Sequence, residues 1–334
     1  MATDIKGGSM NNRQQMSQTV KLLILVVFGG LLPIICLNDS YIVLLLCTTE
    51  ISIIAVSGLD ILFGYSGQIS LGHAGFYCIG AYTSAILSRN LGLPVFATIF
   101  IGGFLAMIVA VLLALPAVKL VHHFLALVTI SFGELIYLFV SEARGLTEGY
   151  TGMNFIPRPK IGNFVFESNT SYYYIIYAML VLLLLLKRRL VDSGTGRAFI
   201  AIREDAYAAN GMGINVTKYK TMAFAISALY TSLAGALYAH LIGFISPESF
   251  SADQSTLFLT MLLFGGMGNF WGPIIGSLAL AMLSDFLQKL GSYQMLVYGV
   301  ILLVIIVYIP GGISRGINVI TFLKGTSKKG KKSC

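Results

Sequence analysis

Long apolar runs constrain the fold of this chain more than any other feature of its sequence. A helical crossing of a bilayer core about 30 Å thick takes about 20 mostly apolar residues. Only 11% of the 334 residues are charged, whereas soluble domains usually carry about 25%. We therefore predict an all-α, polytopic integral membrane bundle of about ten transmembrane helices. The predicted spans are 20–37, 41–63, 69–87, 94–118, 124–140, 172–186, 221–245, 255–267, 271–288 and 293–309.

Clusters of Lys and Arg set the predicted orientation, because cytoplasmic loops collect these residues. They gather near the N-terminus, between Lys187 and Lys220, and in the tail "KGTSKKGKKSC". Six spans before Lys187 and four after Lys220 return the chain to the same face, which predicts cytoplasmic termini in a multi-pass protein of the cell inner membrane. The predicted division is a cytoplasmic N-terminal segment (1–19), a first transmembrane half (20–186) with an outer loop (141–171), a cytoplasmic coupling loop (187–220), a second transmembrane half (221–309) and a basic cytoplasmic tail (310–334).

Three segments leave alternatives open. The run 255–267 is short for a span and could be re-entrant, but that would put the basic tail outside, so we favour a full crossing. The outer loop 141–171 is rich in Gly and Pro, which suit turns rather than helix. It is either a docking surface or a solvated connector.

The inner loop contains an apolar stripe that predicts one amphipathic helix. Phe199, Ile202, Ala206 and Ala209 recur at spacings of three and four, and Gly211 follows as a helix terminator. Such a helix either docks into a groove on a soluble partner or lies against the membrane or the protein's own helix ends.

Nucleotide, metal and nucleic-acid binding are not indicated. The tail lacks the Ser or Thr of a phosphate loop, because Lys332 stands in that place, and "GYSGQI" does not fit the dinucleotide pattern. The four histidines and four cysteines show no ligand spacing. The net charge of +8 follows from the positive-inside bias and a tail suited to anionic lipid. We expect no cofactor and no metal on this chain.

Three acidic residues, Glu50, Asp60 and Glu134, lie in apolar runs. A charge in lipid is costly, so such groups usually face the bundle interior or an aqueous path. They are either pathway residues or partners in buried hydrogen bonds, and Glu134 is the strongest pathway candidate.

The stretch "GYSGQISLGHAGF" interrupts the apolar pattern at residues 64–76. Its glycines predict a turn between the second and third runs. A stripe of small residues follows, and such stripes allow close helix packing in membranes. Freed backbone groups at a break are tolerated only where protein or water covers them, so a pathway element is the alternative. The stripe comprises Ser70, Ala74, Cys78, Ala81 and Ala85.

Several ordered motifs carry a family resemblance over residues 40–315. They are "GYSGQISLGHAGFYCIGAY", "TISFGELI", "GRAFIAIREDAYAANGMGINVTKYK", "AGALYAHLIGFISPESF", "LLFGGMGNFWGPIIGS" and "YIPGG". The chain resembles M-type permease subunits of ATP-driven importers (ABC transporters) for branched-chain amino acids. The resemblance implies a transporter subunit rather than an enzyme. This subunit would form half of the translocation pathway for branched-chain or other hydrophobic amino acids.

The resemblance also implies partners and site residues. The partners are a second, H-type permease, two cytoplasmic ATPases that use the ATP, and an external substrate-binding protein. Two sets of residues coincide with family motif positions. The set for the substrate pathway or helix packing is Gly64, Gly67, Gln68, Ser70, Gly72, His73, Gly75 and Glu134, and the set for ATPase coupling is Arg203, Glu204, Asp205, Ala208, Ala209 and Gly213.

Departures from the family pattern bear on the substrate. Asp60 stands where relatives commonly carry Asn, and the outer loop differs at Glu148, Tyr150 and Thr151. Because related permeases carry urea or short amides, the resemblance implies these as an alternative substrate class. A self-sufficient secondary transporter or channel is the alternative from another class, and it would transport without ATP.

Overall fold

Helices make up almost all of the regular structure. The computed structural model describes residues 39–117, 122–161, 164–166 and 168–288, together with the single positions 29, 30, 33, 297, 299, 300 and 303. Apart from these single positions, the predicted spans 20–37 and 293–309 lie outside the described residues. The eight other predicted spans each correspond to one long helix: α2 (Ser40–Leu59), α3 (His73–Asn90), α4 (Val95–Ala117), α5 (His122–Glu142), α7 (Asn169–Asp192), α10 (Val216–Ile242), α11 (Ala252–Gly265) and α12 (Gly272–Gln288).

Short elements connect the long helices. A π-helix, η1, directly continues α2, and two short helices, α8 and α9, join α7 to α10. The outer loop contains a helical turn of four residues, a 3-10 turn and a two-stranded antiparallel hairpin. The short elements are η1 (Asp60–Tyr65), α6 (Arg144–Thr147), η2 (Gly149–Thr151), β1 (Lys160–Ile161), β2 (Phe164–Val165), α8 (Gly194–Glu204), α9 (Ala206–Gly211) and η3 (Pro247–Phe250).

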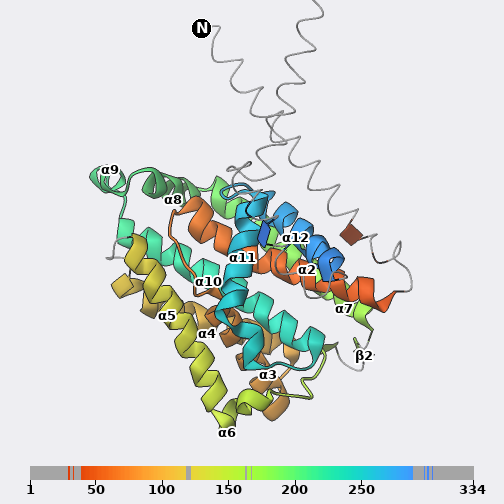
Figure 1. The fold of residues 1–334 in the computed structure, drawn as a ribbon. Coiled ribbons are helices and arrows are strands. Elements are labelled where there is room, and N and C mark those ends of the chain that lie inside the picture. Colours follow the sequence, from red (N-terminus) through yellow and green to blue (C-terminus); the bar gives the residue numbers. More distant parts are fainter. Residues whose placement is uncertain are drawn as a thin grey trace, which may run out of the picture.

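Helix α10 forms the centre of the bundle and packs against α2, α3 and α4 (Figure 1). The most apolar 18-residue stretch of α10 is 78% buried, whereas the corresponding stretch of α5 is only 28% buried. Small residues such as Ala228, Ala234 and Ala236 let neighbouring helices approach α10 closely. The arrangement leaves α4 and α5 with large exposed faces at the periphery.

Four helices in the described part of the chain are long and apolar enough to cross a membrane. They are α2 with η1, α4, α5 and α10. Helix α11 has 14 residues, or about 21 Å at 1.5 Å per residue, which is shorter than a bilayer core of about 30 Å. The helix alone is shorter than the full crossing predicted at 255–267, which stays a prediction. The chain reaches η3 from Ile245, which pairs with Met153 of the outer loop, and leaves α11 at Gly268, which lies beside Arg203 of the inner loop.

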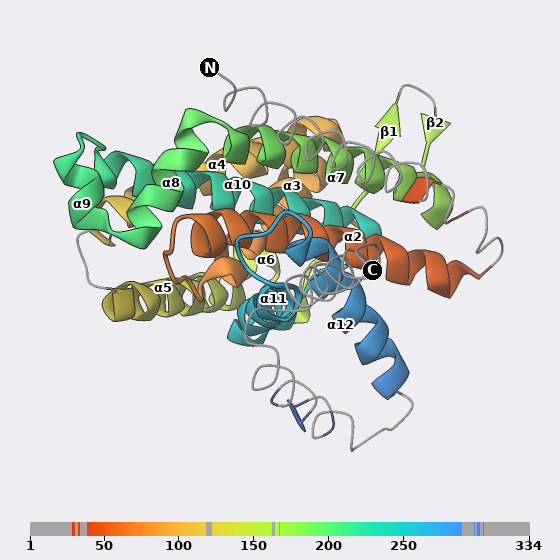
Figure 2. The same ribbon diagram turned by 90° about the horizontal axis from the view of Figure 1, so that it is seen from above.

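The two predicted loops lie at opposite ends of the bundle. Both views place α8 and α9 at one end and the hairpin β1–β2 toward the other (Figures 1 and 2). At the hairpin end, Met153 and Ile245 exchange two backbone hydrogen bonds, N to O, of 2.8 and 3.1 Å. These bonds hold the outer loop against the residues that follow α10.

Candidate functional site

The break between α2 and α3 is tightly packed. Gly67 has a φ of +72°, and a Cβ placed there would lie 2.7 Å from Cγ of Arg203. A Cβ on Gly64 would lie 2.0 Å from Oδ1 of Asp60, and one on Gly72 would lie 2.1 Å from the carbonyl oxygen of Thr129. Each distance is too short for any side chain, so glycine is required where these segments cross.

Polar residues of the break are buried and hydrogen-bonded. Gln68 donates through Nε2 to Oγ of Ser66 at 2.7 Å and to the carbonyl of Lys220 at 3.1 Å. The ring nitrogens of His73 lie 3.1 Å from Oγ of Ser70 and 2.7 Å from Oγ of Ser227. These contacts fix the start of α3 against α10. Contacts of this kind hold helices together, and we call Gln68, Ser70, His73 and Ser227 the packing cluster. A role for these residues in the pathway stays a prediction.

The small-residue stripe lies on α3, but it begins one step later than expected. Helix α3 starts at His73, so Ser70 precedes it. Ala74, Cys78, Ala81 and Ala85 are all buried. Gly75 lies against Phe132 of α5, where an added Cβ would be 3.1 Å from the ring.

The closest contact between α3 and α10 uses two glycines outside that stripe. A Cβ on Gly80 would lie 2.0 Å from the carbonyl oxygen of Ser232, and one on Gly235 would lie 2.0 Å from that of Tyr77. The sequence analysis did not single out either glycine. The small-xxx-small spacing of Gly235 with Thr231 and Ala239 was the available signal.

The three acidic residues of the apolar runs have different surroundings. Glu50 and Asp60 are buried, whereas Glu134 is exposed near the middle of α5. The exposed side chains around it are otherwise mostly large and apolar, although Ser131 one turn earlier is also exposed. Gly133 beside it packs on Gly72, where an added Cβ would lie 3.4 Å from Cα, so Glu134 follows a contact with the break but its own side chain is exposed in the described part of the chain.

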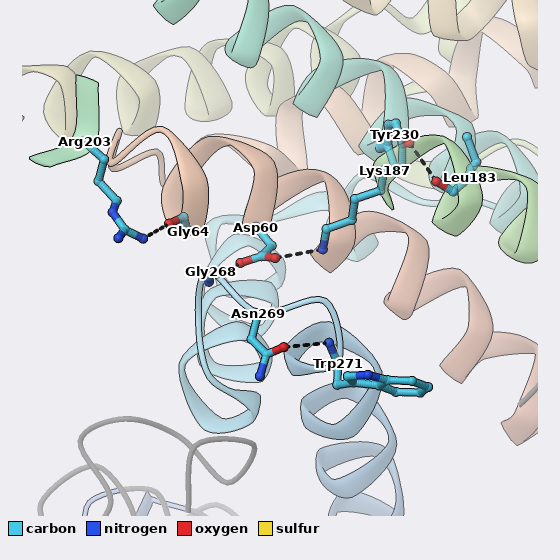
Figure 3. Close-up of polar contacts among 9 residues, drawn as sticks. All are labelled: Asp60, Gly64, Leu183, Lys187, Arg203, Tyr230, Gly268, Asn269 and Trp271. Carbon is cyan, nitrogen blue, oxygen red and sulfur yellow. Dashed lines mark hydrogen bonds and ion pairs between the residues drawn. The ribbon is translucent and has the colours of Figure 1, made fainter. Parts of the chain in front are cut away.

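Asp60 forms a fully buried ion pair with Lys187 (Figure 3). The Lys187 Nζ to Asp60 Oδ2 distance is 2.8 Å, and both side chains are 0% exposed. The prediction that Lys187 faces the cytoplasm is wrong, because α7 continues to Asp192 and carries Lys187 into the bundle. Opposite charges at the ends of two apolar runs were the only signal for this pair in the sequence.

The coupling segment, residues 203–213, contains a break that the periodicity did not predict. Asp205 has extended dihedral angles and separates α8 from α9, while its Oδ1 accepts hydrogen bonds from the backbone N–H of Tyr207 and Ala208 at 2.8 and 3.0 Å. A capping Asp that satisfies the first amides of a helix favours a new helix start. The expected single helix over 199–209 is therefore two helices.

The stripe of the inner loop nevertheless faces the protein. Phe199, Ile202 and Ala209 are buried, so the apolar face of α8 and α9 covers the bundle's own helix ends. In the described part of the chain, the residues exposed away from the bundle are Glu204, Asp205, Tyr207, Ala208, Gly211, Met212 and Gly213. Arg203 is partly exposed as well, but its guanidinium bonds back to the bundle.

A surface pocket of about 460 Å³ lies beside α9. Tyr207 contributes to its lining, and this side chain is 93% exposed, while Met212 is 84% exposed. The remaining residues that line the pocket are Ala206, Asn210, Gly213, Ile214, Asn215, Val216 and Thr217.

No group of three or more His, Cys, Asp and Glu side chains in the described ranges is arranged to hold a metal ion.

Arg203 points back from α8 toward η1 (Figure 3). Its Nη1 donates to the carbonyl oxygen of Gly64 at 2.7 Å. Its Nη2 and Nε donate to Oε1 of Glu204 at 2.6 and 3.2 Å. The last carbonyls of a helix lack intrahelical partners, and a cation stabilises them. Arg203 supplies that partner at the end of α2 and η1.

Comparison with known proteins places these features in a family. The chain is 30% identical over 288 residues to the high-affinity branched-chain amino acid transport system permease protein LivM of Salmonella typhimurium, covering 79% of this chain and 68% of the relative. It is 30% identical over 308 residues to LivM of Escherichia coli K12, covering 85% and 72%. It is 27% identical over 277 residues to the permease protein LivH of the same strain, covering 77% and 88%.

No solved structure matches the chain. Residues 41–306 match one family model, that of the branched-chain amino acid transport system / permease component. This match takes in all the long helices described above. The chain is therefore a polytopic helical membrane protein that belongs to the branched-chain amino acid transport permease family.

Proposed function

We propose that this chain is a permease subunit of an ATP-driven importer for branched-chain or other hydrophobic amino acids. It would form half of the pathway beside a second permease, with two ATPases on one side and a binding protein on the other. The similarity to LivM and LivH, which are both permease proteins of branched-chain amino acid transport, supports the substrate class and the pairing.

The observation that carries the proposal is the free face of α9. Tyr207 and Met212 are large apolar side chains that project from the end of the bundle, 93% and 84% exposed, beside an open pocket. Exposed aromatic anchors next to a pocket are typical of protein interfaces. The ATPase would dock here, which makes this end cytoplasmic and fits cytoplasmic termini and the division into two transmembrane halves around residues 187–220.

A second observation favours α5 as the face that lines the pathway. An exposed carboxylate in the middle of a spanning helix is costly in lipid, so it faces water or protein. Glu134 of α5 meets that description, and its negative charge would attract the ammonium group of an amino acid. The exposed face of α4 suits lipid instead, because its large side chains are all apolar: Phe100, Ile101, Phe104, Leu105, Ile108, Leu112 and Leu115.

Removing the aromatic anchor tests the docking site. We expect Tyr207→Ala to weaken ATPase binding about 30-fold, since an interface hot spot contributes about 2 kcal/mol. Binding is measured by titrating the ATPase against the purified permease pair. Tyr150→Ala is the matched control, because Tyr150 is 56% exposed in the outer loop. Equal binding by the Tyr207 variant and the wild type would contradict the assignment.

Neutralising the carboxylate on α5 tests the pathway. We expect Glu134→Gln to reduce leucine uptake about tenfold, because a charged hydrogen bond is replaced by a neutral one of the same shape. Initial uptake rates into proteoliposomes provide the measurement. Glu142→Gln, at the exposed end of the same helix, should transport as the wild type does. If both variants retain full uptake, this face of α5 does not line the pathway.

The same proteoliposomes separate the alternatives. The proposal expects uptake of leucine only with the second permease, the ATPases, the binding protein and ATP all present. Uptake without ATP would favour a secondary transporter or channel. ATP-driven uptake of urea without leucine would favour the amide importer.

A further inference from the structure

The residues around η1 join three parts of the fold. Asp60 accepts hydrogen bonds from Lys187 Nζ at 2.8 Å and from the backbone N–H of Gly268 at 2.7 Å. Lys187 belongs to α7, which leads into α8, and Gly268 lies in the loop between α11 and α12. A single buried carboxylate therefore holds α2, α7 and the α11–α12 loop together (Figure 3).

Arg203 adds the coupling segment to the same point. Its Nη1 bonds to the carbonyl of Gly64, four residues after Asp60. A Cβ placed on Gly268 would lie 3.0 Å from that same Nη1, so the guanidinium packs directly on the α11–α12 loop. The side chain of Arg203 is 34% exposed, which leaves it much less open than Tyr207, four residues later.

The break at Asp205 separates two roles within the coupling segment. After the break, α9 carries the exposed anchors. Before it, Arg203 lies in the last turn of α8 and turns toward the bundle. Packed elements move as units rather than deforming continuously. A rigid contact of Arg203 with both η1 and the loop at Gly268 would therefore carry a displacement of α8 to α2 and to the α11–α12 pair.

We propose that Arg203 is a positioning residue that transmits movement of the coupling segment to α2 and to the α11–α12 pair, and that it does not contact the ATPase. Within the predicted ATPase-coupling set, this assigns Arg203 the transmission of movement rather than a direct contact. The inference rests on the proposed docking of an ATPase at α9. It differs from that proposal in its consequence, since loss of Arg203 should uncouple ATP use from transport without releasing the ATPase.

The test measures ATPase binding, ATP turnover and leucine uptake in the complete complex. We expect Arg203→Ala to bind the ATPase as the wild type does and to hydrolyse ATP, while leucine imported per ATP falls about tenfold. Arg203→Lys should restore part of this ratio, because an ammonium keeps the charge but cannot serve Gly64 and Glu204 with one rigid fork.

Arg197→Ala is the matched control on α8. Arg197 is exposed, and in the described part of the chain its guanidinium donates one long hydrogen bond, of 3.4 Å, to the carbonyl of Asp192. Its loss should therefore leave the ratio unchanged. Loss of ATPase binding by Arg203→Ala would overturn the proposal, and so would an unchanged ratio.

Variant accumulation and the wild-type complex complete the test. If Arg203→Ala fails to accumulate in the membrane, Arg203→Lys decides: a ratio below the wild type supports the proposal, and a wild-type ratio contradicts it. Failure of the proposed function has a different signature, because the wild-type complex itself would then show no ATP-driven uptake.

Discussion

Replacing Lys187 with methionine is expected to lower the free energy of unfolding by about 3–5 kcal/mol. Among the described residues, the substitution leaves the buried carboxylate of Asp60 with the Gly268 N–H as its hydrogen-bond donor. A buried charge without its counter-ion costs more than the pair contributes, because water can no longer solvate it. Chemical denaturation of the purified protein in detergent measures the loss.

The double variant Asp60→Asn with Lys187→Met removes both charges and should recover most of the lost stability. Buried pairs are often replaceable by uncharged residues at little cost. Lys218→Met is the control, since Lys218 is exposed at the start of α10. The buried pair would lose its assigned importance if the single and double variants were equally unstable, or if the control lost as much as Lys187→Met.

Replacing Gly235 with alanine is expected to destabilise the protein by about 3 kcal/mol, near the upper end of typical overpacking costs. Its Cβ would lie 2.0 Å from the carbonyl oxygen of Tyr77, and backbone cannot rotate away as a side chain can. Helices α3 and α10 would have to separate at their closest contact. Thermal unfolding monitored by circular dichroism measures the effect.

The sign of this effect is informative, because alanine is favoured over glycine within a helix by about 1 kcal/mol. Gly145→Ala in α6 is the matched control: a Cβ there meets nothing within 4 Å, so the variant should be as stable as the wild type or slightly more so. Stabilisation by Gly235→Ala would show that α3 and α10 are not in tight contact.

Much of the helical architecture could be predicted from the sequence. The eight predicted spans within the described ranges each correspond to a helix, because a helix long enough to cross lipid must be mostly apolar. The family also followed from ordered motifs. Helix ends were less predictable. At the start of α3 the Ala74 N–H donates to Oγ of Ser255, on α11, and just before it the Leu71 N–H donates to Oγ1 of Thr129, on α5.

In the coupling segment, the apolar periodicity of the sequence predicted the buried face but not where one helix ends and the next begins. Its apolar stripe correctly predicted which side of α8 and α9 is buried. It could not reveal the break at Asp205, because a backbone turn of one residue barely disturbs a spacing of three and four. Asp205 is a good helix cap, and weighing its capping preference against the stripe would have predicted the second helix start.

The sequence by itself determined that this protein is a bundle of membrane helices, which apolar segments stand in it, and which family it belongs to. Those properties depend on the length and order of local segments. Only the tertiary structure decided that Asp60 pairs with Lys187, 127 residues away, and that Arg203 reaches Gly64, 139 residues away. A charge in a sequence specifies no partner, and packing brings one within hydrogen-bonding distance of another.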